Sequence, residues 1–157
     1  MLLLVLSAGM LAACADPVKP IHAWSPQMAA AASIGTVTIV NRSTNATEQN
    51  LGILKSALEK RLAECAKGPT RYEMQVSVDN YKLANYAAVL LIGDQHEISA
   101  NVKMVDPATR DVAGEYYVQE ITAGGGLIGA ARLSGGAGGI SSDFATSVCR
   151  RVFSAKA

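Results

Sequence analysis

The stretch HEISANVKMVDPATRDVAGEYYVQEIT, residues 96–122, contains two runs of alternating apolar and polar residues on either side of a proline-containing turn. Successive side chains of a strand point to opposite sides, so the apolar residues of the first run share one face. These residues are Ile98, Ala100, Val102 and Met104. The turn lies at 107–110, and the second run covers 112–122. The stretch therefore predicts a β-hairpin.

Two further segments, 35–41 and 71–83, are rich in β-branched residues or alternate, and they predict strands. Between them, apolar residues recur at spacings of three and four, which is typical of a helix with one apolar face. They are Leu51, Leu54, Leu58, Leu62 and Cys65. Asn45 can cap this helix at its start, and Gly68-Pro69 can end it.

A second helix is predicted near the C-terminus, capped by Ser141, Ser142 or Asp143 and ending at about residue 154. The predicted order is β-α-β-β-β-α. We therefore expect an α+β two-layer sandwich, in which two helices cover one face of a four-stranded, mainly antiparallel sheet. Segment 84–95 is apolar before it turns, and it either extends the neighbouring strands or forms an exposed apolar loop.

The first fourteen residues, MLLLVLSAGMLAAC, combine an uncharged apolar run with small residues and a cysteine. The run is too short to span a bilayer, but it suits the apolar region of an export signal. Its ending, LAAC, resembles the bacterial lipobox. The resemblance implies a lipoprotein signal peptide over 1–13, cleavage before Cys14 and attachment of fatty chains to that cysteine. Ala15 after the cysteine implies the outer membrane.

Two alternatives to the lipoprotein hypothesis are a plain signal peptide with a chance cysteine and an N-terminal core helix. No Lys or Arg precedes Lys19, although an export signal normally begins with one. The proline-containing segment 14–33 predicts a tether after the lipidated cysteine. Residues 34–157 are then long enough for a single α+β periplasmic domain. Trp24 either packs onto this domain or lies at the membrane surface.

Cys65 and Cys149 remain after lipidation of Cys14. In an oxidising periplasm such a pair is a candidate disulfide. It would close a loop of about 85 residues, which the chain-entropy model values at about 4.5 kcal/mol. The alternative is two unpaired, buried thiols on helix faces.

Several of these features occur together in one group of proteins. They are the lipobox, the short tether, the helix ending LEKRLAECAKG, the hairpin VKMVDPATRDV and the Gly-rich segment before the last helix. In this combination the chain resembles small outer-membrane lipoproteins of Gram-negative bacteria. The resemblance implies an envelope location and a compact α+β periplasmic domain, and it supplies no activity.

The segment ITAGGGLIGAARLSGGAGGISSDF, residues 121–144, holds eight of the fourteen glycines. It matches the dinucleotide-binding pattern G-x-G-x-x-G by letter, but LSGGAGG interrupts any helix that would follow, and the sheet is expected to be antiparallel there. A flexible or tightly turning connection is the simpler interpretation. A partner-binding segment is the alternative, because small residues allow close backbone approach. Its residues are Gly124, Gly125, Gly126, Leu127, Ile128 and Gly129.

The sequence does not indicate catalysis. It has no G-x-S-x-G, and Asp94, His96 and Glu97 are too few and too local for a metal site. We expect His96 at a solvated strand end. A net charge of +1 without a basic patch argues against nucleic acid. We therefore expect no enzyme activity, no catalytic residues, no metal and no cofactor.

The leading hypothesis is a lipid-anchored, non-enzymatic adaptor or assembly lipoprotein at the periplasmic face of the outer membrane. It would dock on another envelope protein through a sheet edge or the Gly-rich segment. The alternative is an oligomer-forming structural subunit of a larger envelope complex. In that case segments 86–93 and 124–139 would be the subunit contacts.

Overall fold

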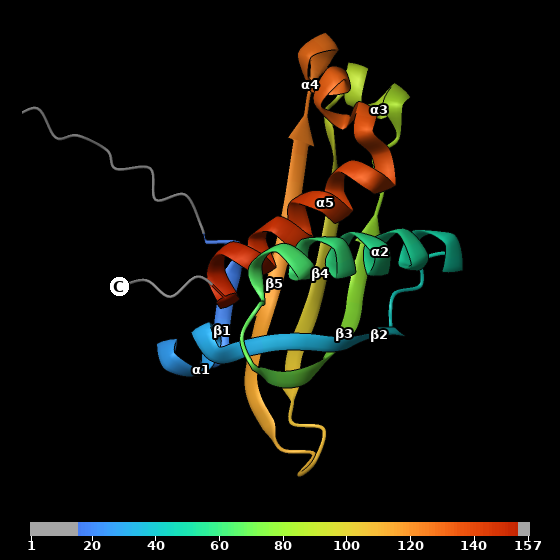
Figure 1. Cartoon of the computed structure of the whole chain (residues 1–157). Helices are drawn as coiled ribbons and strands as arrows, with labels where there is room; N and C mark the ends of the chain where they lie inside the picture. Colours follow the sequence, from blue (N-terminus) through green and yellow to red (C-terminus); the bar gives the residue numbers. More distant parts are fainter. Residues whose placement is uncertain (1–15, 154–157) are drawn as a thin grey trace, which may run out of the picture.

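The computed structural model describes residues 16–153. The expected signal peptide and Cys14 lie outside these residues. Five strands form one sheet in the order β1-β5-β4-β3-β2 (Figure 1). The strands are β1 (Val18–His22), β2 (Ala32–Asn41), β3 (Thr70–Lys82), β4 (Asp94–Val105) and β5 (Val112–Gly124).

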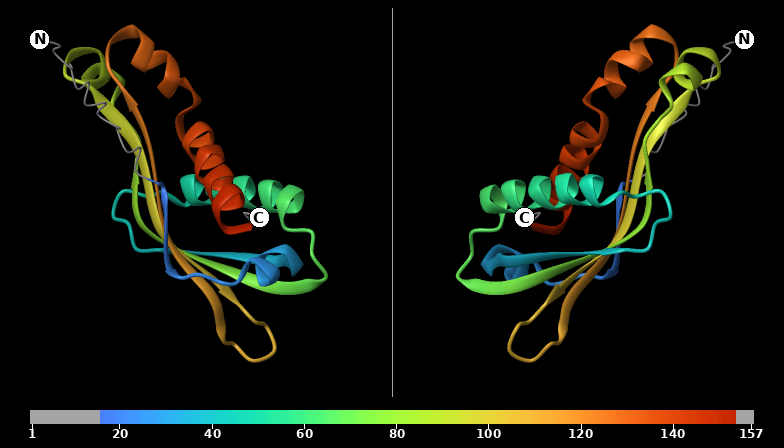
Figure 2. Two further views of the ribbon diagram at one scale, coloured as in Figure 1. Left: turned by 90° about the vertical axis from the view of Figure 1, so that its left-hand side faces the viewer. Right: turned by 90° about the vertical axis from the view of Figure 1, so that its right-hand side faces the viewer.

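Two long helices, α2 (Glu48–Cys65) and α5 (Gly136–Val148), pack against each other and cover the same face of the sheet (Figure 2). The other helical elements are short. They are α1 (Pro26–Ala31), α3 (Tyr86–Leu91), α4 (Gly126–Arg132), the 3-10 turn η1 (Leu133–Gly135) and the π-helical turn η2 (Cys149–Phe153). The predicted α+β class is confirmed, with a fifth strand and additional short helices that the sequence did not reveal.

The predicted hairpin is confirmed as β4 and β5, which pair antiparallel with Ala100 opposite Val118. β2 and β3 are parallel, because α2 carries the chain back across the sheet between them. The helix begins at Thr47, whose hydroxyl accepts from the Asn50 N–H at 3.2 Å. The expected cap, Asn45, instead lies in the preceding turn, where its N–H donates to the Ser43 hydroxyl.

The expected tether is wrong for residues 18–33. β1 pairs antiparallel with β5, and α1 follows it, capped by the Ser25 hydroxyl. Pro20 is compatible with β1 because this is an edge strand, and Pro26 stands at the start of α1, where no intrahelical N–H is needed. The folded domain therefore begins before residue 34.

The expected loop in the Gly-rich segment is also wrong, since residues 126–148 are almost entirely helical. Gly136 starts α5 with a φ of 51°, a conformation that glycine adopts without strain. Ile140, Phe144 and Val148 are buried on one face of α5. Packing of this face compensates for the poor helix propensity of the glycines.

The main core lies between the sheet and the two long helices. Fully buried side chains from both layers meet there, among them Leu54, Leu58, Met74 and Phe144. The predicted disulfide is confirmed: Cys65 at the end of α2 bonds to Cys149 beyond α5, with 6.0 Å between the Cα atoms. No helix within residues 16–153 is both long and apolar enough to cross a membrane.

Candidate interaction sites

The sheet has a second face, which no helix covers within the described residues (Figure 2). Its side chains alternate with the core residues and are mostly polar. Asn101 lies opposite Tyr117, and its amide donates to Glu115 at 2.8 Å. In a second pair, the Gln119 amide donates to Glu97 at 3.0 Å. Cross-strand hydrogen bonds thus order these side chains into a polar surface, which we call the open face.

One buried acceptor on the open face has no hydrogen-bond partner in the described structure: Oδ1 of Asn101. The open face continues to β2, the outermost strand, which pairs on one side with β3. β2 spans ten residues; Lys67 and Gly68 bridge its start at Ala32 and Ser33, and the backbone groups on the outer side of the rest are available to an added strand.

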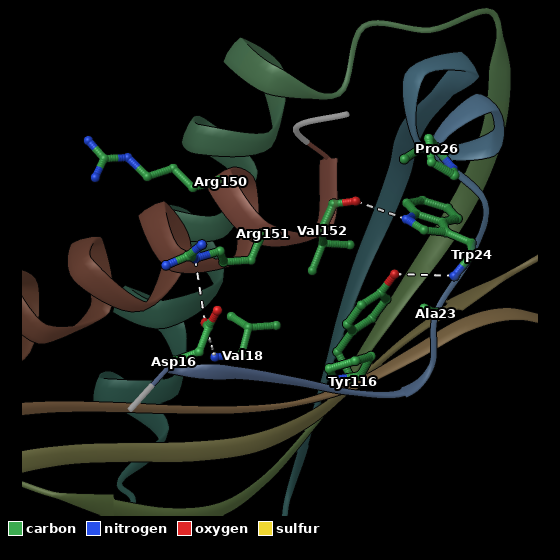
Figure 3. A pocket seen from close by; sticks show the side chains of 11 residues that line it. Asp16, Val18, Ala23, Trp24, Pro26, Tyr116, Arg150, Arg151 and Val152 are labelled. Carbon is green, nitrogen blue, oxygen red and sulfur yellow. Dashed lines mark hydrogen bonds and ion pairs between the residues drawn. The ribbon is translucent and has the colours of Figure 1, made fainter. Parts of the chain in front are cut away.

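A cavity of about 300 Å³ opens beside the first described residues (Figure 3). Trp24 forms part of its wall and is held by two hydrogen bonds. Its backbone N–H donates to the Tyr116 hydroxyl at 3.2 Å, and its indole N–H donates to the Val152 carbonyl at 2.9 Å. The indole also meets Tyr72 and Phe153 edge to face. Of the two alternatives for Trp24, the structure therefore shows packing onto the domain.

Residues that line the cavity also connect the first described residues with the last ones. Asp16 forms an ion pair with Arg151 at 3.4 Å and accepts from the Val18 N–H at 3.1 Å. Burial raises the pKa of Tyr116, and the hydrogen bond from Trp24 partly opposes this rise. The tyrosine hydroxyl thus stays neutral and accepts from the Trp24 N–H. The arrangement fixes the point where the chain leaves the domain toward Cys14.

The strands β3, β4 and β5 extend beyond the long helices and carry α3 and α4 side by side at their end (Figure 1). We call residues 83–93 and 123–133 the tip. Its small core consists of Ala84, Val89 and Leu133. Four large apolar side chains of the tip are more than three-quarters exposed: Leu91 at 83%, Ile92 at 85%, Leu127 at 82% and Ile128 at 76%.

His96 connects the two halves of the tip. Its Nδ1 accepts from the Ala84 N–H at 2.8 Å, so the ring proton lies on Nε2, which donates to the Leu133 carbonyl at 3.0 Å. The side chain is 3% exposed, so the expectation of a solvated strand end is wrong. His96 stands two residues before Ile98 and shares its face of β4, but its two distant backbone partners are set by the tertiary structure.

Asp94 stands at the base of the tip. Its carboxylate accepts from Lys82, the Asn85 N–H and the Gln95 N–H, and these bonds lower its pKa to about 2, with the Lys82 bond contributing most. Asp94 and His96 therefore hold the backbone in place. Within residues 16–153, no three His, Cys, Asp or Glu side chains lie close enough to hold a metal ion.

The predicted partner-binding segment consists of two parts that pack differently. Gly124 and Gly129 face each other, and a Cβ placed on Gly124 would lie 2.8 Å from the Gly129 carbonyl oxygen. The close approach that the sequence suggested therefore occurs within the chain, between β5 and α4. Leu127 and Ile128 point outward instead. The sequence showed that glycines are present, but it did not show that Gly124 packs against Gly129.

Comparison with known proteins gives a fold and no family. No model of a protein family matches the chain, and no curated protein is detectably similar in sequence. A crystal structure of the PelC dodecamer from Paraburkholderia phytofirmans matches 84% of this chain and 97% of its own, with 10% identity and a TM-score of 0.54. A single-substitution variant of that dodecamer matches 85% and 97%, with 11% identity and a TM-score of 0.51.

A candidate lipoprotein from Caulobacter crescentus CB15 matches 71% of this chain and 86% of its own, with 13% identity and a TM-score of 0.49. At such low identities the likeness to PelC establishes a shared fold alone. The class defined here is a small α+β domain with one covered and one open sheet face.

Proposed function

We propose that the protein is a lipid-anchored, non-enzymatic adaptor or assembly lipoprotein that docks on another cell-envelope component from the periplasmic face of the outer membrane. The observation that carries this proposal is the small number of residues between Cys14 and the start of the fold. Asp16 is already paired with Arg151, and β1 starts at Val18. Two Cα–Cα steps span at most about 8 Å, so a lipid on Cys14 holds the domain against the bilayer.

The disulfide supports an extracytoplasmic location, because such bonds persist in oxidising compartments. The open face supports docking, since its ordered amide and carboxylate groups present hydrogen-bonding partners. The edge of β2 adds a place for strand pairing.

The anchor is tested by feeding cells a palmitate analogue and comparing the wild type with Cys14→Ala. We expect the label in the wild type and its loss in the variant. Equal labelling of both proteins would contradict the assignment of Cys14.

Docking is tested with a photo-crosslinking amino acid in intact cells. One probe replaces Tyr117 on the open face and a second replaces Thr38 on β2. A matched control replaces Lys60, which is exposed on α2 on the opposite side of the molecule. We expect one envelope protein to crosslink from Tyr117 or Thr38 and to be absent from Lys60. The same products from all three positions would argue against a specific surface.

A second candidate function is an oligomer-forming structural subunit of an envelope complex. The observation that favours it is the likeness to PelC, whose solved structures are dodecamers. Segments 86–93 and 124–139 would then be the subunit contacts. Size-exclusion chromatography of the chain from Ala15 onward separates the two candidates, because a monomer at high concentration would exclude the oligomer.

A further inference from the structure

We propose that the tip is a second membrane contact, which inserts its exposed apolar side chains into the bilayer that holds Cys14. This inference rests on the lipid anchor proposed above. It assigns the partner of the tip as a lipid surface and fixes how the domain is oriented on the membrane.

The composition of the tip suits lipid. Residues 83–93 carry no charged side chain, and Arg132 is the one charged residue within 123–133. Lys82 and Asp94, the charged residues that flank segment 83–93, are paired with each other. Protein-binding surfaces normally surround an apolar centre with polar residues, whereas segments that lie in a membrane interface present a continuous apolar side.

The tip also satisfies much of its own backbone, as an apolar environment requires. The Asn85 side chain accepts from the N–H groups of Ala87 and Ala88 at the start of α3. The Tyr86 hydroxyl donates to the Leu133 carbonyl at 2.9 Å. The exposed residues Leu91 and Leu127 take no part in these bonds, so they are available to contact acyl chains.

The strand register directs the chain that precedes Val18 toward the end of the molecule that carries the tip. Val18 lies opposite Val118, and the Gln119 N–H donates to the Pro17 carbonyl at 2.8 Å. Followed backward from Val18, the chain therefore runs alongside β5 in the direction of Gly124, where the tip begins (Figure 1). A lipid on Cys14 and the tip are thus directed toward one bilayer.

The distances agree with simultaneous contact. Gly124 lies six residues beyond Val118, about 20 Å along the strand. Cys14 lies four residues before Val18 and reaches at most about 14 Å. At full extension the chain would therefore bring Cys14 to within about 6 Å of the level of Gly124. Two such contacts act together, because the first raises the effective concentration of the second, as a second acyl chain does.

The test uses the chain from Ala15 onward, which contains the sheet, both cores and the disulfide. An N-terminal hexahistidine tag holds it on vesicles of phosphatidylethanolamine, phosphatidylglycerol and a nickel-chelating lipid. The domain is thereby tethered at its natural point without lipidation of Cys14. Failure of the tip proposal is therefore distinguishable from failure of the anchor, which the palmitate experiment tests.

A polarity-sensitive fluorophore is attached to a single introduced thiol, Leu91→Cys or Leu127→Cys. The control is Thr109→Cys, in the exposed turn between β4 and β5 at the opposite end. Cys65 and Cys149 are bonded to each other and do not react. On vesicles, we expect a blue shift and quenching by lipid-phase quenchers at both tip positions, and neither effect at Thr109.

Solvent-like emission at either tip position on the vesicles would overturn the proposal. So would a blue shift that develops without vesicles as the protein concentration rises, because the tip would then be binding a second copy of the chain.

Discussion

The body of the molecule and its tip use apolar residues in opposite ways. In the body, α2 and α5 bury a large continuous core against the sheet, and a disulfide joins their ends. In the tip, the core consists of Ala84, Val89 and Leu133, while larger side chains face outward. The tip is held mainly by polar contacts from His96, Asp94 and Tyr86.

This difference indicates two kinds of stability in one chain. Burial of apolar area stabilises the body, and its loss unfolds the whole domain. A small element held by a few hydrogen bonds opens locally at a lower free energy. Changes in the body should therefore alter global unfolding, whereas changes at the tip should alter local opening.

Removing the disulfide should have the greatest effect. The bond closes a loop with a sequence separation of 84 residues. We expect the double variant Cys65→Ala/Cys149→Ala to lose about 4.5 kcal/mol of unfolding free energy, because the unfolded chain gains conformational freedom. Urea denaturation measures the loss, and the reduced wild type serves as control. A loss below about 1 kcal/mol would show that the bond contributes little to the body.

A matched pair of leucine substitutions tests the contrast directly. Leu58 is fully buried in α2, whereas Leu127 is 82% exposed at the tip. Leu58→Ala should lower the unfolding free energy by about 3 kcal/mol through lost burial and a cavity. Leu127→Ala should change it by less than about 0.5 kcal/mol. Equal losses in denaturant titrations would contradict the division into body and tip.

Loss of the His96 side chain should open the tip before the body. His96→Ala leaves the Ala84 N–H without a partner and the Leu133 carbonyl with the Tyr86 hydroxyl alone, which costs about 2 kcal/mol of local stability. Hydrogen exchange measured by mass spectrometry should become faster in segments 84–91 and 126–133. Gln95→Ala is the control, since it keeps the backbone bonds of its neighbour. Uniform acceleration across β3 and β4 would mean that His96 stabilises the body instead.

Acid should loosen the base of the tip, with the smallest effect. The folded-state pKa of Asp94, about 2, lies below its ordinary value of 3.8. Its stabilising contribution is therefore complete above about pH 4 and is lost as the pH falls through about 2. The amide NMR signal of Asn85 should report this change, and Asp94→Asn should abolish its acid dependence. A midpoint near 3.8 in the wild type would contradict the lowered pKa.

Some features were predictable because they depend on local pattern. Alternation identified the β4–β5 hairpin, and leucines at helical spacing identified α2. The pairing of Cys65 with Cys149 followed from cysteine number and helix faces, although a free pair remained open. In each case the signal lies within one element or in the residue type itself.

Other features were not predictable because their partners are distant in sequence. β1 exists through pairing with β5, and Trp24 is fixed by Tyr116 and Val152. The glycines of α5 resemble a loop, yet the buried face of Phe144 makes the segment helical. The tip was the least visible, since the two arms joined by His96 come from segments about forty residues apart.

The sequence by itself determined the α+β class, the central hairpin, the first long helix and the cysteine pair, because hydrophobic periodicity is written within each segment. The tertiary structure alone decided the parallel β2–β3 pair, the entry of residues 18–33 into the domain, and the direction in which the chain before Val18 runs along β5, toward the tip. These features depend on contacts between segments that are distant in sequence. Burial and hydrogen bonding between such segments are established only when the whole chain folds.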